Sequence, residues 1–347
     1  MLENARFAAV SVIVLVVVSA CTEPSSTCPQ AQGLIGDGIA RFSPADVACE
    51  TLPGSMALAE PKLTRGHVPG DWPNTPTFSK VNETFAAAIA IEEGTSLYGT
   101  GEIAGPLLRN GAVTEVWTAQ PFRENPPEGS SFVEYDDQLP NLYQAHPWVL
   151  AVRPDGSSFG VLADTTYRAR VDLTEGIGFF APVPFPVIVI QGESPQEVLT
   201  KLSGLTGTIE LPPLWALGYQ QARWSYVPDT RIIEIADEFR KRSIPCDVLW
   251  ADIDYMNGFR IFTFDEMLFP DPHGLNDYLH DNGFKSVWIL DPGVKVDPGY
   301  FVYDEGIVDD HFIHRPDGEL FVAGSWPGDS VWPDYTSPDT QIGTAHV

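Results

Sequence analysis

Positive charge is scarce in this chain, and its scarcity narrows the kinds of partner that the chain can bind. The 347 residues include 20 Lys and Arg against 47 Asp and Glu, which gives a formal net charge of −27. The one dense group of cations is the triplet at residues 240–242, which we interpret as the flank of a helix C-terminus. Proteins that bind a phosphate backbone need clustered Lys and Arg, so we expect no nucleic-acid partner. An acidic surface suits a neutral or cationic substrate.

Metal-binding patterns are also missing. The sequence has only four cysteines and seven histidines, and their spacing matches no zinc motif. A calcium loop that started at Asp252 would have Gly at its sixth position and Glu at its twelfth. This chain has Asn257 and Thr263 there. We therefore predict no metal site.

A hydrophobic run long enough to span a bilayer is lacking as well. The uncharged apolar run at residues 7–20 is shorter than the ~20 residues that a membrane-spanning helix needs. It follows Arg6 and is typical of an export signal. Residues 18–21 resemble the lipobox of bacterial lipoproteins. We predict a lipoprotein signal peptide over residues 1–21, lipidation of Cys21, and an exported chain anchored to a bacterial membrane, in the periplasm or at the cell surface. An uncleaved anchor stays open, because Glu3 offsets Arg6.

The remaining cysteines would then lie in an oxidising compartment. Cys28 and Cys49 are candidates for a disulfide, but sequence spacing leaves the pairing open. Cys246 lies within an apolar run, which is typical of a small buried thiol.

Residues 57–210 carry the pattern of an antiparallel β-sandwich, preceded by a linker at residues 22–56. Short alternating segments are separated by Gly and Pro, and Tyr167, Ala169, Val171 and Leu173 fall on one face of such a segment. The stretch "RPDGSSFG" has the turn residues that join two strands of a hairpin. With 44% hydrophobic residues, the chain has enough apolar surface to fold into two domains.

From residue 211 to 347 the pattern changes to alternating strands and helices, which is typical of parallel β/α units. The predicted strands are "WALGYQQARW", "CDVLWADI" and "KSVWILDPGV". One helix begins near Asp229 or Thr230, and a second ends at Gly283. About three strands fit either the first part of a (β/α)8 barrel or a doubly wound sheet, and both place functional groups at the C-terminal ends of strands.

Polar residues mark those strand ends. A strand continued through "WADID" would put Asp252 and Asp254 on one face and Ile253 on the other, and Asp291 follows the next strand. Paired carboxylates with aromatic neighbours such as Trp224 suit a sugar, because carboxylates accept strong hydrogen bonds from hydroxyls and flat rings pack against a pyranose. A solvated turn or a helix cap is the structural alternative for this pair.

Several motifs in order give the chain a resemblance to glycoside hydrolase family 31. They are "LPPLWALGYQQARWSY", "RSIPCDVLWADIDYMNGFRIFTFD", "FPDP", "VWILDPGV" and "WPGDSVWPDY", preceded by "LYGTGE" and "NLYQAHPWVLAVRPDGSSFGVLAD". The resemblance covers roughly residues 95–336. It implies a galactose-mutarotase-like β-sandwich followed by a (β/α)8 TIM barrel.

The resemblance also implies a retaining α-glycosidase that needs no cofactor and acts on an α-linked oligosaccharide or glycoside. Asp252 would hold hydroxyls of the sugar at the scissile bond. The other residues that it implies for substrate binding are Ile253, Trp288, Ile289, Asp291 and Trp326, with Asp136 or Asp137 supplied by a loop of the sandwich.

The chain departs from the family in one respect. The family's nucleophile lies in a W-x-D-M-N-E motif, which is missing from this sequence. The stretch from residue 211 onwards is also short of the about 250 residues of a whole barrel. We therefore expect a partial barrel and a truncated chain with no catalytic residue of its own, since the nucleophile and the acid/base would lie beyond Val347.

Two functions follow as hypotheses. The first is an exported α-glucosidase-like enzyme that removes terminal α-linked glucosyl or related sugars by double displacement, of which this chain is an inactive fragment. Related activities, such as those of an α-xylosidase or a transglycosylase, stay open. The alternative is a noncatalytic surface lipoprotein that binds sugar.

Overall fold

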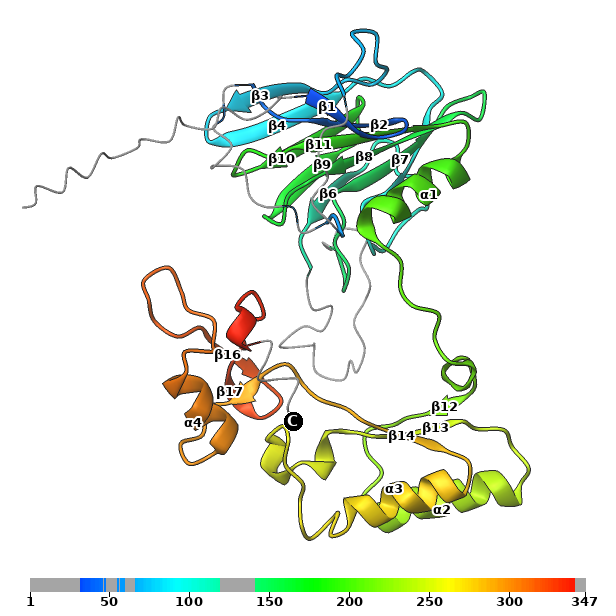
Figure 1. Ribbon diagram of the computed structural model, residues 1–347, viewed down its shortest axis with the longest axis vertical. Coiled ribbons are helices and arrows are strands. Elements are labelled where there is room, and N and C mark those ends of the chain that lie inside the picture. The colour runs from blue at the N-terminus through cyan, green and yellow to red at the C-terminus, as the bar shows by residue number, and fades with distance from the viewer. Residues whose placement is uncertain are drawn as a thin grey trace, which may run out of the picture. The chain divides into compact units, whose positions relative to one another are not determined.

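The computed structural model describes residues 32–45, 47, 55, 57–59, 66–118 and 141–340. The chain divides into two compact units, residues 1–209 and residues 210–347 (Figure 1). The division lies within two residues of the change in sequence pattern at residue 211.

The N-terminal unit is a sandwich of two antiparallel sheets, as the alternating pattern predicts (Figure 1). Along the first sheet the strands are β1 (Gln32–Gly36), β2 (Ile39–Phe42), β11 (Val187–Gly192), β8 (Ser158–Ala163), β7 (Trp148–Val152) and β5 (Ser96–Gly99). Along the second they are β3 (Thr77–Val81), β4 (Thr84–Ile89), β10 (Ile177–Ala181), β9 (Ala169–Asp172) and β6 (Val113–Val116). Alternate residues of β10 are buried, and Phe159 and Phe179 of the two sheets belong to one apolar core.

The first sheet begins in a segment that the sequence had led us to predict as linker, so the predicted linker at residues 22–56 is wrong in part. Strands β1 and β2 form a hairpin around Asp37 and Gly38, where Gly38 takes a positive φ of 65°. Ile39 and Phe42 are buried. Their burial, together with the Asp-Gly turn, explains why this segment pairs with the sheet instead of linking two parts of the chain.

Helix α1 (Pro195–Thr206) covers part of the first sheet and was not predicted. Ser194 caps it by accepting a hydrogen bond from the backbone N–H of Glu197, and the Glu197 carboxylate accepts one from the N–H of Glu193. The arrangement resembles a capping box, except that the Glu197 carboxylate takes the N–H of the residue before the N-cap. Val198 and Leu205, on the inner face of the helix, are buried.

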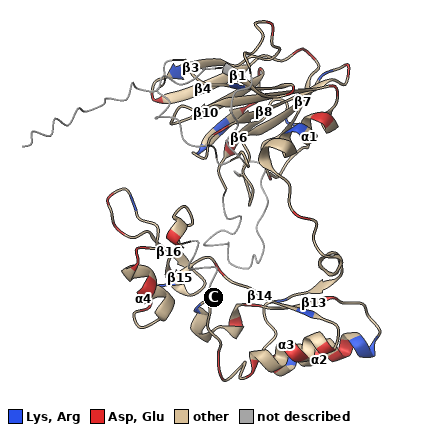
Figure 2. Cartoon of the chain, viewed as in Figure 1, with Lys and Arg blue, Asp and Glu red and all other residues tan. Residues whose placement is uncertain are grey.

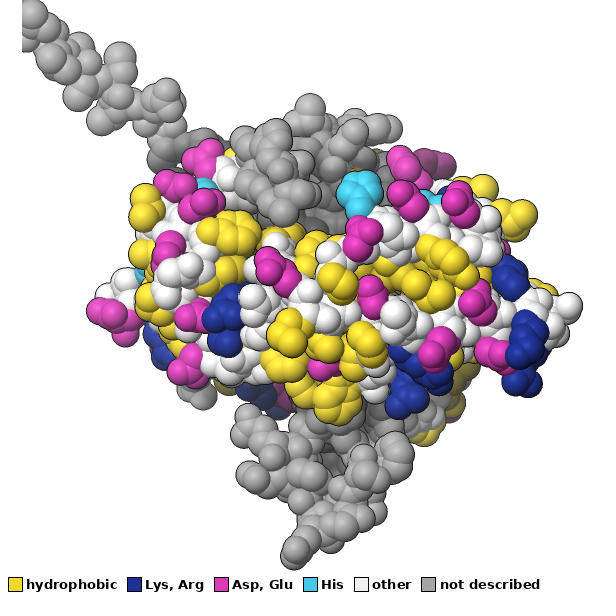
Figure 3. All heavy atoms as spheres, turned by 90° about the horizontal axis from the view of Figure 1, so that it is seen from below, with side chains coloured by type: hydrophobic (Ala, Val, Ile, Leu, Met, Phe, Trp, Pro, Cys, Tyr) yellow, Lys and Arg dark blue, Asp and Glu magenta, His cyan; other side chains and the backbone are white. Residues whose placement is uncertain are grey.

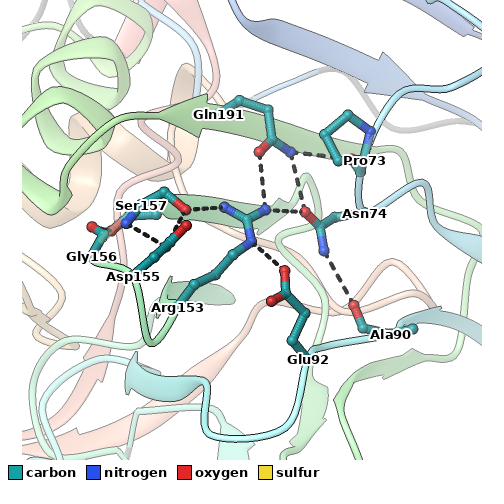
Figure 4. Close-up of polar contacts among 10 residues, drawn as sticks. Pro73, Asn74, Ala90, Glu92, Arg153, Asp155, Gly156, Ser157 and Gln191 are labelled. Atoms are coloured by element: carbon teal, nitrogen blue, oxygen red, sulfur yellow. Dashed lines mark hydrogen bonds and ion pairs between the residues drawn. The ribbon is translucent and has the colours of Figure 1, made fainter.

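A polar cluster around Arg153 ties a loop to the sandwich (Figure 4). The guanidinium donates to Asn74 Oδ1 at 2.6 Å and to Gln191 Oε1 at 3.3 Å, and it pairs with Glu92 at 3.1 Å. It also lies over the ring of Phe159, 4.7 Å from the centroid. Because the Arg153 side chain is only 12% exposed, these partners supply the hydrogen bonds that water would make to an exposed guanidinium.

The C-terminal unit contains the predicted parallel strands and helices. Strands β12 (Gln220–Gln221), β13 (Val248–Ala251) and β14 (Lys285–Trp288) form a parallel sheet in sequence order, and α2 (Asp229–Lys241) and α3 (Pro272–Asp281) lie on one side of it (Figure 1). The start of α2 at Asp229 agrees with the prediction. The first strand is shorter than predicted, because Leu214–Leu217 forms a 3₁₀ turn, η2. In the part of the chain that the structure describes, these strands do not close a barrel.

Smaller elements complete this unit. They are the 3₁₀ turns η3 (Ile253–Tyr255) and η4 (Asn257–Phe259), helix α4 (Phe301–Val308), and the antiparallel sheet of β15 (Val294–Lys295), β17 (Gly328–Val331) and β16 (Val322–Ser325). One apolar core joins them to α2 and α3.

The cationic triplet lies at the C-terminal end of α2, as predicted (Figure 2). Lys241 and Arg242 both pair with Glu238, at 2.8 and 2.6 Å. Arg240 packs 3.5 Å from the ring centroid of Phe284 and donates to the carbonyl of Asn282. The triplet therefore lies where α2 ends, and Arg240 joins that end to the loop between α3 and β14.

Apolar side chains are interspersed with acidic ones on the face shown in Figure 3. Large apolar side chains are also exposed in the segment that leads into the second unit, including Ile209, Leu211 and Leu214. Within the described residues, no helix combines the length and the apolar character needed to cross a bilayer.

Candidate active site

The candidate site is built at the C-terminal ends of the three parallel strands. The register pairs Gln221 of β12 with Leu249 of β13, and Ala251 of β13 with Trp288 of β14. The residues that follow these strands therefore emerge at one edge of the sheet, as the sequence predicts. Asp252 follows β13 directly, and Asp291 follows β14 after two residues.

The two aspartates of the "DID" motif do not share a strand face, so that prediction is wrong. Strand β13 ends at Ala251, and Asp252 caps the turn η3, its Oδ1 accepting from the N–H of Ile253 at 2.7 Å. Ile253 and Tyr255 are 5% and 3% exposed. The turn η3 replaces the strand from Ile253 onwards, and its three residues per turn abolish the period of two that would have aligned Asp252 with Asp254. The helix-cap alternative is thus the one that describes the backbone role of Asp252.

Asp254 points to a different set of partners. Its Oδ2 accepts a hydrogen bond from Trp224 Nε1 at 2.8 Å and another from the Ser225 hydroxyl. Trp224 and Ser225 lie in the loop after β12. Asp254 therefore holds that loop beside the end of β13.

The carboxylate that interacts electrostatically with Asp252 is Asp291. Burial raises the pKa of Asp291, and the negative charge of Asp252 raises it further. Burial, followed by the charge of Asp291, also raises the pKa of Tyr255 to about 12. The Tyr255 hydroxyl donates to the Ile289 carbonyl at 2.8 Å, so this tyrosine serves the site as a neutral, fixed donor.

The predicted apolar site residues pack in or against the apolar core beneath the C-terminal ends of the parallel strands. Ile253 lies in the core of the unit, and Trp288 and Ile289 pack against that core. Trp288 donates from Nε1 to Asn276 Oδ1 at 3.1 Å, and its ring meets Tyr255 edge-on with centroids 4.9 Å apart. Direct contact of these three residues with a sugar stays a prediction.

Two tryptophans lie close together at the surface. Trp326, at the turn between β16 and β17, and Trp224 have ring centroids 6.2 Å apart and a tilt of 39°. They are 68% and 66% exposed. Trp326 was predicted as a site residue, whereas Trp224 appeared in the sequence only as one of many nearby aromatics. The contact between the two rings could not be predicted from the sequence, because the two residues are far apart along the chain.

Some predicted residues lie outside the described residues, namely Asp136, Asp137, Cys21, Cys28 and Cys49. Cys246 is a free thiol, buried as predicted, and burial raises its pKa. No group of metal-ligating side chains is found in the described part of the chain.

Two family models match the chain. Residues 57–172 match the glycosyl hydrolase 31 N-terminal galactose mutarotase-like domain, and residues 209–343 match the glycosyl hydrolases family 31 TIM-barrel domain. The chain belongs to glycoside hydrolase family 31. The family 31 sandwich and partial barrel inferred from the sequence motifs are therefore confirmed.

Family 31 relatives of the chain include alpha-glucosidase 2 of Bacillus thermoamyloliquefaciens, which is 38% identical over 71% of this chain and 30% of that enzyme. An alpha-glucosidase of Mucor javanicus is 31% identical over 72% of this chain and 28% of that enzyme. The chain thus spans about 30% of the length of these two curated relatives.

Solved family 31 structures agree with this assignment. The family 31 alpha-glucosidase of Bacteroides thetaiotaomicron is 48% identical, with a TM-score of 0.65 over 74% of this chain and 42% of that one. A family 31 dextranase of Flavobacterium johnsoniae complexed with isomaltotriose superposes with a TM-score of 0.76 over 90% of this chain and 42% of that one. At 22% identity, the dextranase supports the fold only.

Proposed function

We propose that this chain forms part of a retaining α-glycosidase that removes terminal α-linked glucosyl or related units. The observation that carries the proposal is the arrangement at the strand ends, where Asp252 and Asp291 are close enough to interact electrostatically. The exposed pair Trp224 and Trp326 belongs to the same unit. The names of the family 31 relatives, several of them alpha-glucosidases, support glucose as the sugar.

Each group has a role that its chemistry suits. The Asp252 and Asp291 carboxylates accept hydrogen bonds from sugar hydroxyls, and such charge-assisted bonds are stronger than neutral ones. The tryptophan faces give a neighbouring sugar ring a flat apolar surface. Asp254 positions Trp224, and Tyr255 positions the backbone at Ile289; neither touches the substrate. Neither Asp252 nor Asp291 is proposed as the nucleophile or as the acid/base.

Export and anchoring belong to the same proposal. The apolar run at residues 7–20 and the lipobox-like residues 18–21 support cleavage before Cys21, and lipidation of Cys21 would hold the protein at a bacterial membrane. A membrane-anchored glycosidase would act on glycans outside the cytoplasm. Metabolic labelling with a radioactive fatty acid, compared between the wild type and Cys21→Ala, tests this part. Equal labelling of the two would contradict it.

The enzyme proposal is tested by expressing residues 1–347 and any longer product of the same reading frame. Release of p-nitrophenol from its α-glucoside and its α-xyloside is then measured for each. We expect a longer product to hydrolyse the α-glucoside and residues 1–347 to show no measurable turnover, because the sequence lacks the W-x-D-M-N-E motif. A longer product that hydrolyses neither glycoside would overturn the proposal.

The second candidate is a noncatalytic sugar-binding lipoprotein, for which the exposed pair Trp224 and Trp326 would serve equally well. It shares the carboxylates and the tryptophans but makes no covalent intermediate. Saturable binding of glucose without hydrolysis by every product of the reading frame would establish it.

A further inference from the structure

A cavity lies entirely within the N-terminal unit and contains none of the residues discussed above for the active site. Its volume is about 940 Å³, which is in the range typical of small-molecule sites. It opens at one end of the sandwich, where the ends of β5 and β6, the start of β7, the loop after β8 and the last turns of α1 meet. We call it the sandwich cavity. The lining residues that matter for its chemistry are Trp117, Gln144, His146, Trp148, Asp164 and Tyr167.

One of the two carboxylate oxygens of Asp164, in the wall of the sandwich cavity, is unpaired among the described residues. Asp164 is 4% exposed, and its Oδ1 accepts a hydrogen bond from the Ser55 hydroxyl at 3.0 Å. Its Oδ2 has no hydrogen-bond partner among the described residues. Burial raises the pKa of Asp164, although Ser55 and Arg41 act in the opposite direction. Leaving a buried carboxylate oxygen unpaired costs free energy, so its presence calls for a partner that the described residues do not supply.

The rest of the lining matches a neutral ligand rich in hydroxyls. Trp117 and Tyr167 are each 49% exposed and offer flat apolar faces. Gln144 and His146 lie 3.3 Å apart through Oε1 and Nε2 and present amide and imidazole edges. An anion would meet the Asp164 carboxylate and a chain of net charge −27. Hydroxyl groups could both donate to the unpaired oxygen and accept from the amide.

We propose that the sandwich cavity is a noncatalytic binding site for a neutral sugar of up to about three rings. Trp117 and Tyr167 pack against its rings, and one hydroxyl donates to Asp164 Oδ2. Because that oxygen is buried in the wall, neighbouring side chains shift to admit the donor. This site would retain a glycan on the N-terminal unit whether or not the C-terminal unit hydrolyses it.

The test uses the whole chain, residues 1–347, titrated calorimetrically with maltotriose and with isomaltotriose up to about 10 mM, so that dissociation constants around 1 mM are reached. The variants Trp117→Ala and Asp164→Asn address the sandwich cavity. Asp252→Asn and Trp326→Ala address the candidate active site and serve as matched controls. Each pair of variants removes one carboxylate charge and one indole ring. We expect Trp117→Ala and Asp164→Asn to weaken one binding event at least tenfold. The two controls should leave that event unchanged.

A melting experiment separates a ligand role from a structural role for Asp164. Asparagine keeps the oxygen that accepts from Ser55 and removes the buried charge. If Asp164 serves a ligand, Asp164→Asn melts at the same or a higher temperature than the wild type and loses the sugar-dependent rise in Tm. The proposal is overturned if neither trisaccharide binds, if binding survives both cavity variants, or if Asp164→Asn lowers the Tm without changing the affinity. None of these outcomes bears on hydrolysis, which depends on the C-terminal unit.

Discussion

Trp224 Nε1 donates a hydrogen bond to Asp254 Oδ2 across 2.8 Å, which joins the loops that follow two neighbouring strands. The Ser225 hydroxyl donates to the same oxygen. Asp254 is therefore a positioning residue, and the ring that it orients lies 6.2 Å from that of Trp326. The second aspartate of the "DID" motif thus positions an aromatic ring, and under the proposed function it would act on a sugar only through that ring.

Replacement of Asp254 should loosen Trp224 without removing a sugar ligand. Asp254→Ala deletes the acceptor of two hydrogen bonds, which stabilise the loop by about 1–3 kcal/mol together. We expect the tryptophan fluorescence of the variant to be quenched more readily by acrylamide. Trp224→Phe is the control, because it removes this fluorophore and so shows how much of the quenched signal comes from Trp224. Unchanged quenching in Asp254→Ala would show that the hydrogen bond does not hold the ring.

The pH dependence of Asp291 should respond to Asp252. Burial and the Asp252 charge both raise the pKa of Asp291, so Asp252→Asn removes one of the two causes. We expect the titration midpoint of the Asp291 carboxyl, followed by ¹³C NMR, to move to lower pH while staying above the ordinary aspartate value of 3.8, because burial persists. An unmoved midpoint would mean that the two carboxylates do not interact.

The same shift has a consequence for stability. A carboxyl whose pKa is raised on folding penalises the folded state at any pH above its folded-state pKa, and the penalty is relieved as the pH falls from that value towards the unfolded one. Asp291→Asn should therefore raise the free energy of unfolding at neutral pH and lose this advantage in acid. Urea unfolding at several pH values measures it. An advantage that grows in acid would contradict the assigned direction.

Two glycines of the sandwich should respond oppositely to alanine. A Cβ on Gly160 of β8 would lie 1.9 Å from the Trp148 ring, whereas a Cβ on Gly204 of α1 meets no atom within 4 Å. We expect Gly160→Ala to destabilise the sandwich by about 1–3 kcal/mol through overpacking. Gly204→Ala should stabilise it by about 0.5–1 kcal/mol, because alanine favours a helix interior. Thermal unfolding of both variants gives the comparison, and equal shifts would refute the packing of Trp148 on Gly160.

The Arg153 cluster of Figure 4 should depend on Asn74 in two separable ways. Asn74 accepts from Arg153, and its backbone has a positive φ of 59°. Asn74→Gly removes only the side chain, whereas Asn74→Ala also forces a residue with a Cβ into the left-handed region. We expect both to destabilise, and alanine more than glycine by about 1 kcal/mol. If glycine is as harmful as alanine in urea unfolding, the hydrogen bond alone accounts for the effect.

The sequence predicts the elements well where hydrophobic periodicity is strong. The parallel strands, the helices α2 and α3, and the sandwich all follow from it. The hairpin at residues 32–42 was missed because a short strand pair close to an apparent linker carries few periodic residues. Its Asp-Gly turn and the apolar Ile39 were nonetheless signals that could have identified it.

The site shows where sequence reasoning reaches its limit. Asp252 and Asp291 were singled out because they follow predicted parallel strands, and Trp326 was added by the resemblance to family 31; contact of the three with a sugar stays a prediction. Sequence reasoning wrongly paired Asp252 with Asp254, because the prediction continued the strand through both residues, whereas β13 ends at Ala251 and the 3₁₀ turn η3 begins at Ile253. It also missed Asp164, whose Oδ2 is buried without a partner among the described residues, because such burial is a property of the folded structure alone.

The most direct test of the account compares Asp252→Asn with Asp254→Asn in glucose binding by calorimetry, on residues 1–347 or any longer product of the same reading frame. If Asp252 faces the sugar and Asp254 faces Trp224, Asp252→Asn loses a charge-assisted bond of about 1.5–3 kcal/mol, a loss of about 10- to 100-fold in affinity. Asp254→Asn should change the affinity for a single glucose less than threefold. Equal losses in the two variants, or undiminished binding by Asp252→Asn, would contradict the assignment.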